Sequence, residues 1–132
     1  MKQENSSKPQ PKKQAGVWID HQHAVLIAAP EGQYTVQQSI ETTAPAHSRH
    51  SEQAIHNAEQ AITEKHFHSV AEHLAGYDEI FLFGQGTAQA EMKNHLNEDP
   101  RFRGKKIAID TVDRLTQDQM VAKVRSFFDR VV

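Results

Sequence analysis

The stretch of residues 78–92 constrains the fold of this chain more than any other part of the sequence. Residues 80–83, Ile-Phe-Leu-Phe, are apolar without alternation, which is typical of a strand that is covered on both faces. Gly-Gln-Gly at 84–86 indicates a tight turn, and residues 88–96 then carry apolar side chains at helical spacing. A buried strand, a glycine turn and a helix in this order predict a central strand of an α/β sheet.

Size and composition limit the class of protein. With 132 residues the chain has the length of one domain, which can bury a core without disulfides. The sequence has no cysteine, so it has neither disulfides nor thiolate metal ligands, which fits a reducing cytosol. No run approaches the roughly 18 apolar residues of a membrane helix, and the first residues lack the apolar core of a secretory signal. We therefore expect a cytoplasmic protein without a membrane partner.

The net charge of −2 excludes a polycation that coats nucleic acid, so any contact with RNA has to be local. Residues 1–15 carry several lysines and almost no apolar side chains, so we expect them to form a disordered basic tail. This tail, which includes Lys12 and Lys13, is either a solubilising segment or an arm that contacts phosphates. One folded domain is expected over residues 16–132.

The remaining secondary structure follows from periodicity and turn residues. Three β-rich segments separated by polar turns open the domain and predict antiparallel strands. A long helix follows, and two short apolar runs then alternate with helices. The predicted order is β-β-β-α-β-α-β-α, a mixed five-stranded α/β sheet packed with helices. The expected strands are 17–19, 24–28, 34–40, 80–83 and 107–109, and the expected helices are 51–75, 88–96 and 116–128.

Three local patterns add detail to this order. Thr116 and Gln119 have the spacing of a capping box, so each side chain is expected to bond the backbone amide of the other. Tyr34, Val36 and Ile40 are evenly spaced, as expected for the third strand. The apolar stripe of the long helix drifts between its two halves, which indicates a bend or a change of buried face.

The Gly-Gln-Gly turn at 84–86 invites comparison with a phosphate-binding loop, because free amides before a helix favour an anion. No Gly-Lys-Ser/Thr follows it, and Gln89 occupies the position where a dinucleotide fingerprint requires its third Gly or Ala. A Gly-x-Gly between a strand and a helix is most often needed for space. We interpret the turn as a structural corner and expect no bound cofactor.

Nine histidines raise the question of a metal site. The tightest pairs are His21 with His23 and His66 with His68. On a helix, His66 and His68 would point about 200° apart, so they cannot bind one ion. The sequence also lacks cysteine and a His-Glu-x-x-His element, so we expect solvent-facing histidines and no metal.

Carboxylates offer one catalytic alternative. Asp20 in the first hairpin and Asp110 at the end of a later strand are typical of the acidic cluster that holds two magnesium ions in ribonuclease H-like nucleases. Glu59 or Glu64 on the long helix would complete the cluster. The predicted element order is compatible with that fold, although fold order alone does not give function. The alternative is therefore a magnesium-dependent nuclease that uses Asp20, Asp110 and Glu64. No serine lies on a strand-to-helix elbow, so the sequence shows no nucleophile.

Three segments carry a family resemblance. They are 16–25, Gly-Val-Trp-Ile-Asp-His-Gln-His-Ala-Val; 80–93, Ile-Phe-Leu-Phe-Gly-Gln-Gly-Thr-Ala-Gln-Ala-Glu-Met-Lys; and 111–125, Thr-Val-Asp-Arg-Leu-Thr-Gln-Asp-Gln-Met-Val-Ala-Lys-Val-Arg. With these segments the chain resembles the small bacterial proteins often labelled translational machinery proteins. Those proteins are similar to the middle domain of the archaeal and eukaryotic class 1 release factors and of Pelota, the ribosome-rescue factor. The resemblance spans residues 16–128 and implies a ribonuclease H-like α/β domain associated with the ribosome.

The resemblance also indicates where function would lie. In release factors the loop between the third strand and the long helix carries Gly-Gly-Gln, whose Gln helps water reach the ester of peptidyl-tRNA. Residues 42–50 of this chain read Thr-Thr-Ala-Pro-Ala-His-Ser-Arg-His, without Gly-Gly-Gln. The resemblance therefore implies a Pelota-like role without peptide release.

The same loop is the best candidate for RNA contact on its residues alone. His47, Arg49 and His50 are cationic or nearly so, and Lys12 and Lys13 can join them on phosphates. An ordinary polar loop is an equally good interpretation. The first hypothesis is a non-enzymatic accessory protein in stress or ribosome rescue, with the ribosome or ribosomal RNA as partner and no small-molecule substrate. The nuclease and a protein-interaction module are the alternatives.

Overall fold

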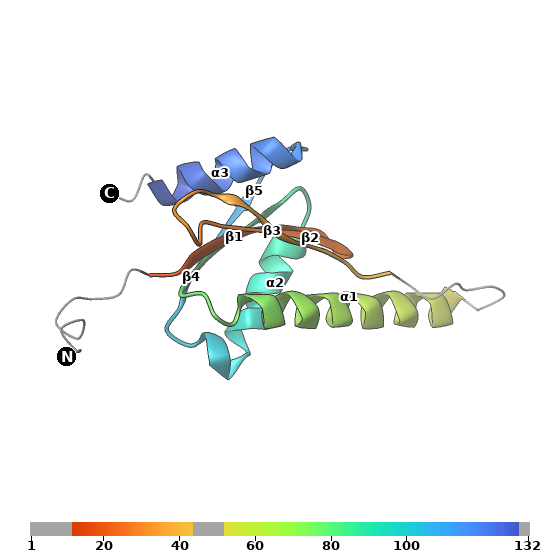
Figure 1. The fold of residues 1–132 in the computed structure, drawn as a ribbon. Coiled ribbons are helices and arrows are strands. Elements are labelled where there is room, and N and C mark those ends of the chain that lie inside the picture. The colour runs from red at the N-terminus through yellow and green to blue at the C-terminus, as the bar shows by residue number, and fades with distance from the viewer. Residues whose placement is uncertain (1–11, 44–51, 130–132) are drawn as a thin grey trace.

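One mixed five-stranded sheet forms the centre of the computed structural model (Figure 1). The structure describes residues 12–43 and 52–129, with the backbone alone over 52–58. The strands are β1 (Gln14–Ile19), β2 (His23–Ala28), β3 (Thr35–Glu41), β4 (Glu79–Gly84) and β5 (Lys106–Thr111), and the helices are α1 (Glu52–Leu74), α2 (Ala88–Asn97) and α3 (Gln117–Asp129).

The predicted element order is confirmed. Across the sheet the strands follow β3-β2-β1-β4-β5. β2 is antiparallel to both β1 and β3, whereas β4 and β5 run parallel to β1. This is the mixed five-stranded α/β sheet expected from the sequence. None of the helices in the described part of the chain is both long and apolar enough to cross a membrane.

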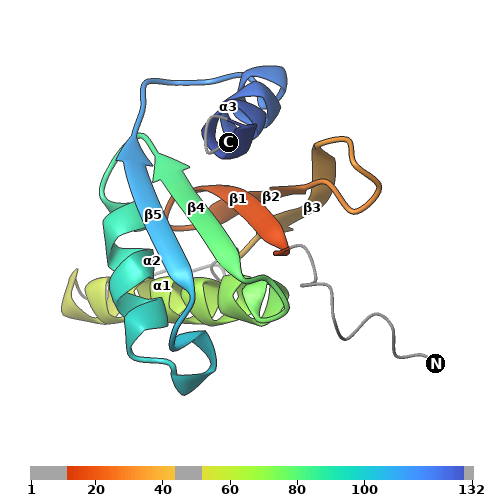
Figure 2. The same ribbon diagram turned by 90° about the vertical axis from the view of Figure 1, so that its left-hand side faces the viewer.

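Helices cover both faces of the sheet, with α1 and α2 on one face and α3 on the other (Figure 2). In β4, Ile80 and Leu82 pack on the α1 and α2 side, whereas Phe81 and Phe83 pack on the α3 side. All four side chains are at most 1% exposed, so the predicted strand with two covered faces is confirmed. Burying one such side chain contributes about 1.5–3 kcal/mol.

The predicted capping box is present at the start of α3. The backbone amide of Gln119 donates to the hydroxyl of Thr116 at 3.2 Å, and the amide of Thr116 donates to Oε1 of Gln119 at 2.8 Å. These bonds satisfy two amides that have no partner within the helix. Further along α3, the ring of Phe127 stacks on Phe81 with centroids 4.0 Å apart, which joins the helix to the sheet.

β3 departs from simple alternation. Consecutive residues of β2 pair with Gln38 and Val36, so Gln37 is an extra residue on β3. A β-bulge of this kind reverses which side chains face which side of the sheet. Val36 therefore packs with the core under α3, and Ile40 packs with the core under α1 and α2. In a regular strand the even spacing of Val36 and Ile40 would put both side chains on one face of the sheet.

β1 begins at Gln14, slightly before the expected start of the folded domain. Ala15 is completely buried, which explains why the strand extends this far back. Before it, the carbonyl of Lys13 accepts hydrogen bonds from the amides of Asp78 at 2.7 Å and Glu79 at 3.1 Å. The last residues of the expected tail thus take part in the hydrogen bonding between β1 and the start of β4.

The turn after β4 needs the absence of a side chain at one of its two glycines. A Cβ atom at Gly84 would collide with the backbone carbonyl oxygen of Ile19 and would lie 2.8 Å from Oε1 of Gln89. A Cβ atom at Gly86 would meet nothing within 4 Å. The interpretation of the turn as a structural corner therefore holds for Gly84 and not for Gly86.

Alanine substitutions at these two glycines should differ in their effect on stability. Gly84→Ala forces β1 and β4 apart, so we expect it to lower the free energy of unfolding by about 1–3 kcal/mol. Gly86→Ala is the matched control, and its unfolding free energy should be unchanged or slightly raised. Urea unfolding of both variants measures the difference, and equal stabilities would contradict the close approach of the two strands.

Candidate functional site

An open pocket of about 810 Å³ lies at the carboxyl end of β1. Its walls are the turn between β1 and β2, the middle of α1 and the first turn of α2. The carboxyl ends of parallel strands are where ligands usually bind in α/β sheets, so this pocket is the first place to look for chemistry. The lining residues are Asp20, His21, Gln22, His23, Glu59, Gln60, Thr63, Glu64, Phe67 and Glu91.

Asp20 holds the turn between β1 and β2 in shape. Its Oδ1 atom accepts hydrogen bonds from the backbone amides of Gln22 at 2.8 Å and His23 at 2.5 Å. The Nδ1 atom of His23 lies 3.2 Å from the same carboxylate oxygen. Aspartate side chains that bond the following amides stabilise tight turns. The carboxylate of Asp20 therefore has a structural role.

His21 joins this turn to α2. Its Nε2 atom lies 3.2 Å from each carboxylate oxygen of Glu91, and the hydroxyl of Thr87 donates to Glu91 at 2.7 Å. The hydrogen bond from Thr87, and to a smaller extent the contact with His21, lowers the pKa of Glu91. Glu91 thus stays ionised at neutral pH, and the pocket keeps an acidic wall.

His66 of α1 lies behind the pocket and is completely buried. Its Nδ1 atom is 2.8 Å from the hydroxyl oxygen of Thr42, and its Nε2 atom has no hydrogen-bond partner among the described residues. Burial lowers the pKa of His66, and the nearby backbone of His23 offsets this effect only in part. The ring is therefore neutral at neutral pH.

The expectation of solvent-facing histidines is confirmed for His21 and His68, whose side chains are 46% and 69% exposed, and it is wrong for His66. A sequence signal for this burial exists. His66 stands four residues after Ile62 and four before Val70, so it lies on the apolar stripe that packs against the sheet. Residue type alone predicts exposure at this position, whereas the helical position predicts burial.

The structure does not bring together the three carboxylates of the nuclease alternative. Asp20 and Glu64 both line the pocket. Asp110 lies near the end of β5, and its carboxylate pairs with Lys123 of α3 at 2.8 Å, on the opposite side of the sheet. In the part of the chain whose side chains are described, no group of three histidine or acidic side chains is placed to hold a metal ion.

The two segments that carry the candidate RNA contacts adjoin opposite ends of β1. Lys12 and Lys13 precede β1, at its amino end. The loop after β3 starts at the other end of β1, because the amide of Thr42 bonds the carbonyl of Gln22 at 2.8 Å. The length of β1 separates these points by roughly 20 Å. The loop candidates themselves, His47, Arg49 and His50, lie outside the described residues.

No family model and no curated protein sequence matches this chain. Solved structures that share its fold include the following two. Archaeoglobus fulgidus Pelota superposes with a TM-score of 0.60 at 13% identity, over 98% of this chain and 34% of the Pelota chain. The archaeal translation termination factor aRF1 superposes with a TM-score of 0.54 at 12% identity, over 89% of this chain and 39% of the aRF1 chain.

This chain therefore spans well under half of either protein. The resemblance to Pelota and to class 1 release factors, expected from the sequence, is confirmed for the fold. Membership of the small bacterial family remains a prediction.

The burial of His66 predicts how stability depends on pH. Because its pKa is lowered in the folded protein, the unfolded chain binds a proton that the folded one does not once the pH falls below about 6.5. The free energy of unfolding should therefore fall as the pH drops from that value. His66→Gln should lose this part of the slope, and His68→Gln, at an exposed site, should keep it. Urea unfolding between pH 7 and 5 tests this, and equal slopes in the wild type and His66→Gln would contradict it.

Proposed function

We propose that this chain is a non-enzymatic, cytoplasmic accessory protein that binds the ribosome or ribosomal RNA and acts in stress or ribosome rescue. The observation that supports the proposal is the fold. Nearly the whole chain superposes on Pelota, and 89% of it superposes on an archaeal translation termination factor. Because a fold alone does not give an activity, we propose a binding partner and no chemical reaction.

Peptide release is not part of the proposed function. The release-factor chemistry described above needs Gly-Gly-Gln in the loop between the third strand and the long helix. The corresponding residues 42–50 contain no glycine and no glutamine. A binding role is therefore better supported than hydrolysis of peptidyl-tRNA.

The geometry also weakens the nuclease alternative. A two-metal nuclease needs its carboxylates within one ion cluster, with metals roughly 4 Å apart. Here Asp110 pairs with Lys123 beside α3, while Asp20 lies in the pocket on the other side and bonds backbone amides. No described contact favours the protein-interaction module over RNA binding.

Sedimentation tests the proposed partner directly. In lysate separated on a sucrose gradient at low salt, the full-length chain should migrate with ribosomes or their large subunits. The fraction bound should fall as the salt concentration rises, because contacts with phosphates release counterions. A chain that stays at the top of the gradient at low salt, in both growing and starved cells, would contradict the proposal.

A further inference from the structure

Basic residues that are far apart in the sequence lie together at the amino ends of the parallel strands β1, β4 and β5. In the sheet Gln14 of β1 pairs with Glu79 of β4, which pairs with Lys106 of β5, so all three strands begin at one edge. Basic residues lead into β1 and into β5, and their side chains are exposed or half-buried. We call them the amino-edge cluster: Lys12, Lys13, Arg103, Lys105 and Lys106.

Backbone hydrogen bonds fix the two basic segments relative to each other. The amide of Asp78 donates to the carbonyl of Lys13 at 2.7 Å, and the carbonyl of Asp78 accepts from the amide of Lys106 at 3.3 Å. Asp78 thus connects both segments. With β4 between them, the backbones of β1 and β5 are two strand spacings apart, roughly 9.5 Å. Flexible lysine side chains at this distance can reach neighbouring phosphates of one strand.

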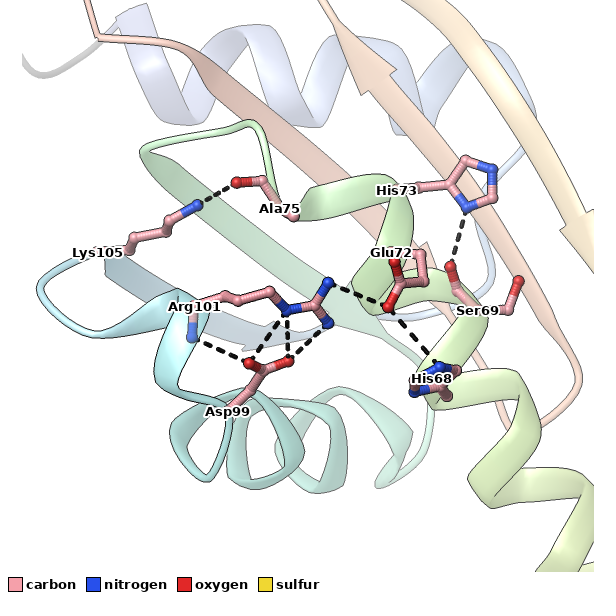
Figure 3. Close-up of polar contacts among 8 residues, drawn as sticks. All are labelled: His68, Ser69, Glu72, His73, Ala75, Asp99, Arg101 and Lys105. Carbon is pink, nitrogen blue, oxygen red and sulfur yellow. Dashed lines mark hydrogen bonds and ion pairs between the residues drawn. The ribbon is translucent and has the colours of Figure 1, made fainter.

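The turn before β5 is held rigidly. Phe102 is 4% exposed and anchors it, and the amides of Arg103 and Lys105 bond the carbonyls of Pro100 and Phe102 at 3.3 and 3.2 Å. The ammonium group of Lys105 donates to the carbonyl of Ala75 at 2.5 Å (Figure 3). The backbone of this turn is thus ordered before a ligand binds, which reduces the entropy lost on binding.

The carboxylates around the cluster have hydrogen-bond partners other than the cationic groups of the cluster. Arg101 pairs with Asp99 at 2.8 Å and with Glu72 at 3.0 Å (Figure 3). The hydrogen bonds from Arg101 lower the pKa of Asp99 to about 2. Asp78 accepts from the backbone amide of Lys13 at 3.0 Å, and Glu79 accepts from the side-chain amide of Gln14 at 2.7 Å.

None of the five cluster cations forms an ion pair with any described residue. Lys105 bonds the carbonyl of Ala75, so the other four charges are the ones open to an external anion. The opposite end of the parallel strands is acidic, since Asp20, Glu59, Glu64 and Glu91 line its pocket. This end repels phosphates, so a polyanion is directed to the amino edge.

We propose that the amino-edge cluster is the surface on which this protein binds the phosphate backbone of RNA, an inference that rests on the proposed function. Five exposed or half-buried cations on two chain segments fit an extended polyanion. Phe102 is buried and cannot stack on a base. Contacts of cations with phosphates carry no sequence information, so binding is independent of base sequence. The fold shared with a translation factor favours RNA over an anionic membrane.

A double charge reversal tests the cluster. Arg103→Glu with Lys106→Glu, in the full-length chain, should weaken binding to single-stranded poly(U) by about tenfold or more at moderate salt. Between about 50 and 200 mM salt, the slope of log affinity against log salt should become shallower by about 1.4, or about 0.7 for each lost phosphate contact. Fluorescence anisotropy gives both quantities.

The matched control is Lys65→Glu with Arg114→Glu. It makes the same change in net charge at exposed residues, on α1 and in the loop after β5. Affinity and salt slope should stay close to those of the wild type, and both double variants should keep the wild-type thermal midpoint. Equal losses in the two double variants would overturn the inference, because the effect would then be one of net charge.

Other outcomes separate the inference from the proposed function. Loss of binding in Arg49→Glu with full binding in the Arg103→Glu, Lys106→Glu variant would assign the contact to the loop and overturn the inference. The inference is also overturned if the wild type does not bind poly(U) at low salt but binds phosphatidylserine vesicles. If that double variant still migrates with ribosomes like the wild type, the inference fails and the proposed function stands. If the wild type binds poly(U) through the cluster but never migrates with ribosomes, the inference stands and the proposed function fails.

Discussion

The position of β1 in the sheet is the constraint on which the rest of this structure depends. β1 pairs antiparallel with β2 on one side and parallel with β4 on the other. It therefore joins the antiparallel strands β2 and β3 to the parallel strands β4 and β5. Two close approaches make this possible. A side chain at Gly84 would collide with the carbonyl of Ile19, and a side chain at Gly16 would collide with Val124 of α3. β4 and α3 therefore both pack directly on the backbone of β1.

The direction of the strands also arranges the charges. Because β1, β4 and β5 run the same way, residues that precede them share one edge and residues that follow β1 meet α1 and α2 at the other. Five cations, with Asp78 and Glu79 among them, lie at the first edge, and carboxylates line the pocket at the second. A net charge of −2 conceals this separation. A weakly acidic protein can thus present a local basic surface to a polyanion.

Features set by neighbouring residues could be predicted from the sequence. The apolar run of β4 and the capping box at Thr116 depend on contacts within a few residues, and both are confirmed. Features set by register could not. The bulge at Gln37 depends on how β2 pairs with β3, and the side of the sheet that Asp110 faces depends on the alignment of β5. His66 is intermediate, because its helical position indicates burial although its residue type does not.

The contrast between features set by neighbouring residues and features set by strand pairing also explains which basic residues the sequence indicates and which only the fold does. The basic residues of the tail and those of the 42–50 loop each form a compact group in the sequence, so sequence patterns indicate them. The basic residues that share an end of the sheet with Lys13 come instead from the turn before β5 and from its first residue. The parallel pairing of β1, β4 and β5 brings them there. Only the fold reveals this proximity, since no local pattern links residue 13 to residue 106.

Lysine footprinting measures this surface without any substitution. The free protein and its complex with RNA are treated with an amine-acylating reagent, and mass spectrometry gives the extent of modification at each lysine. Our account predicts that Lys12, Lys13 and Lys106 are protected in the complex, while Lys65 on the exposed side of α1 reacts as in the free protein. Protection of Lys65 with unchanged reactivity at Lys13 and Lys106 would contradict it.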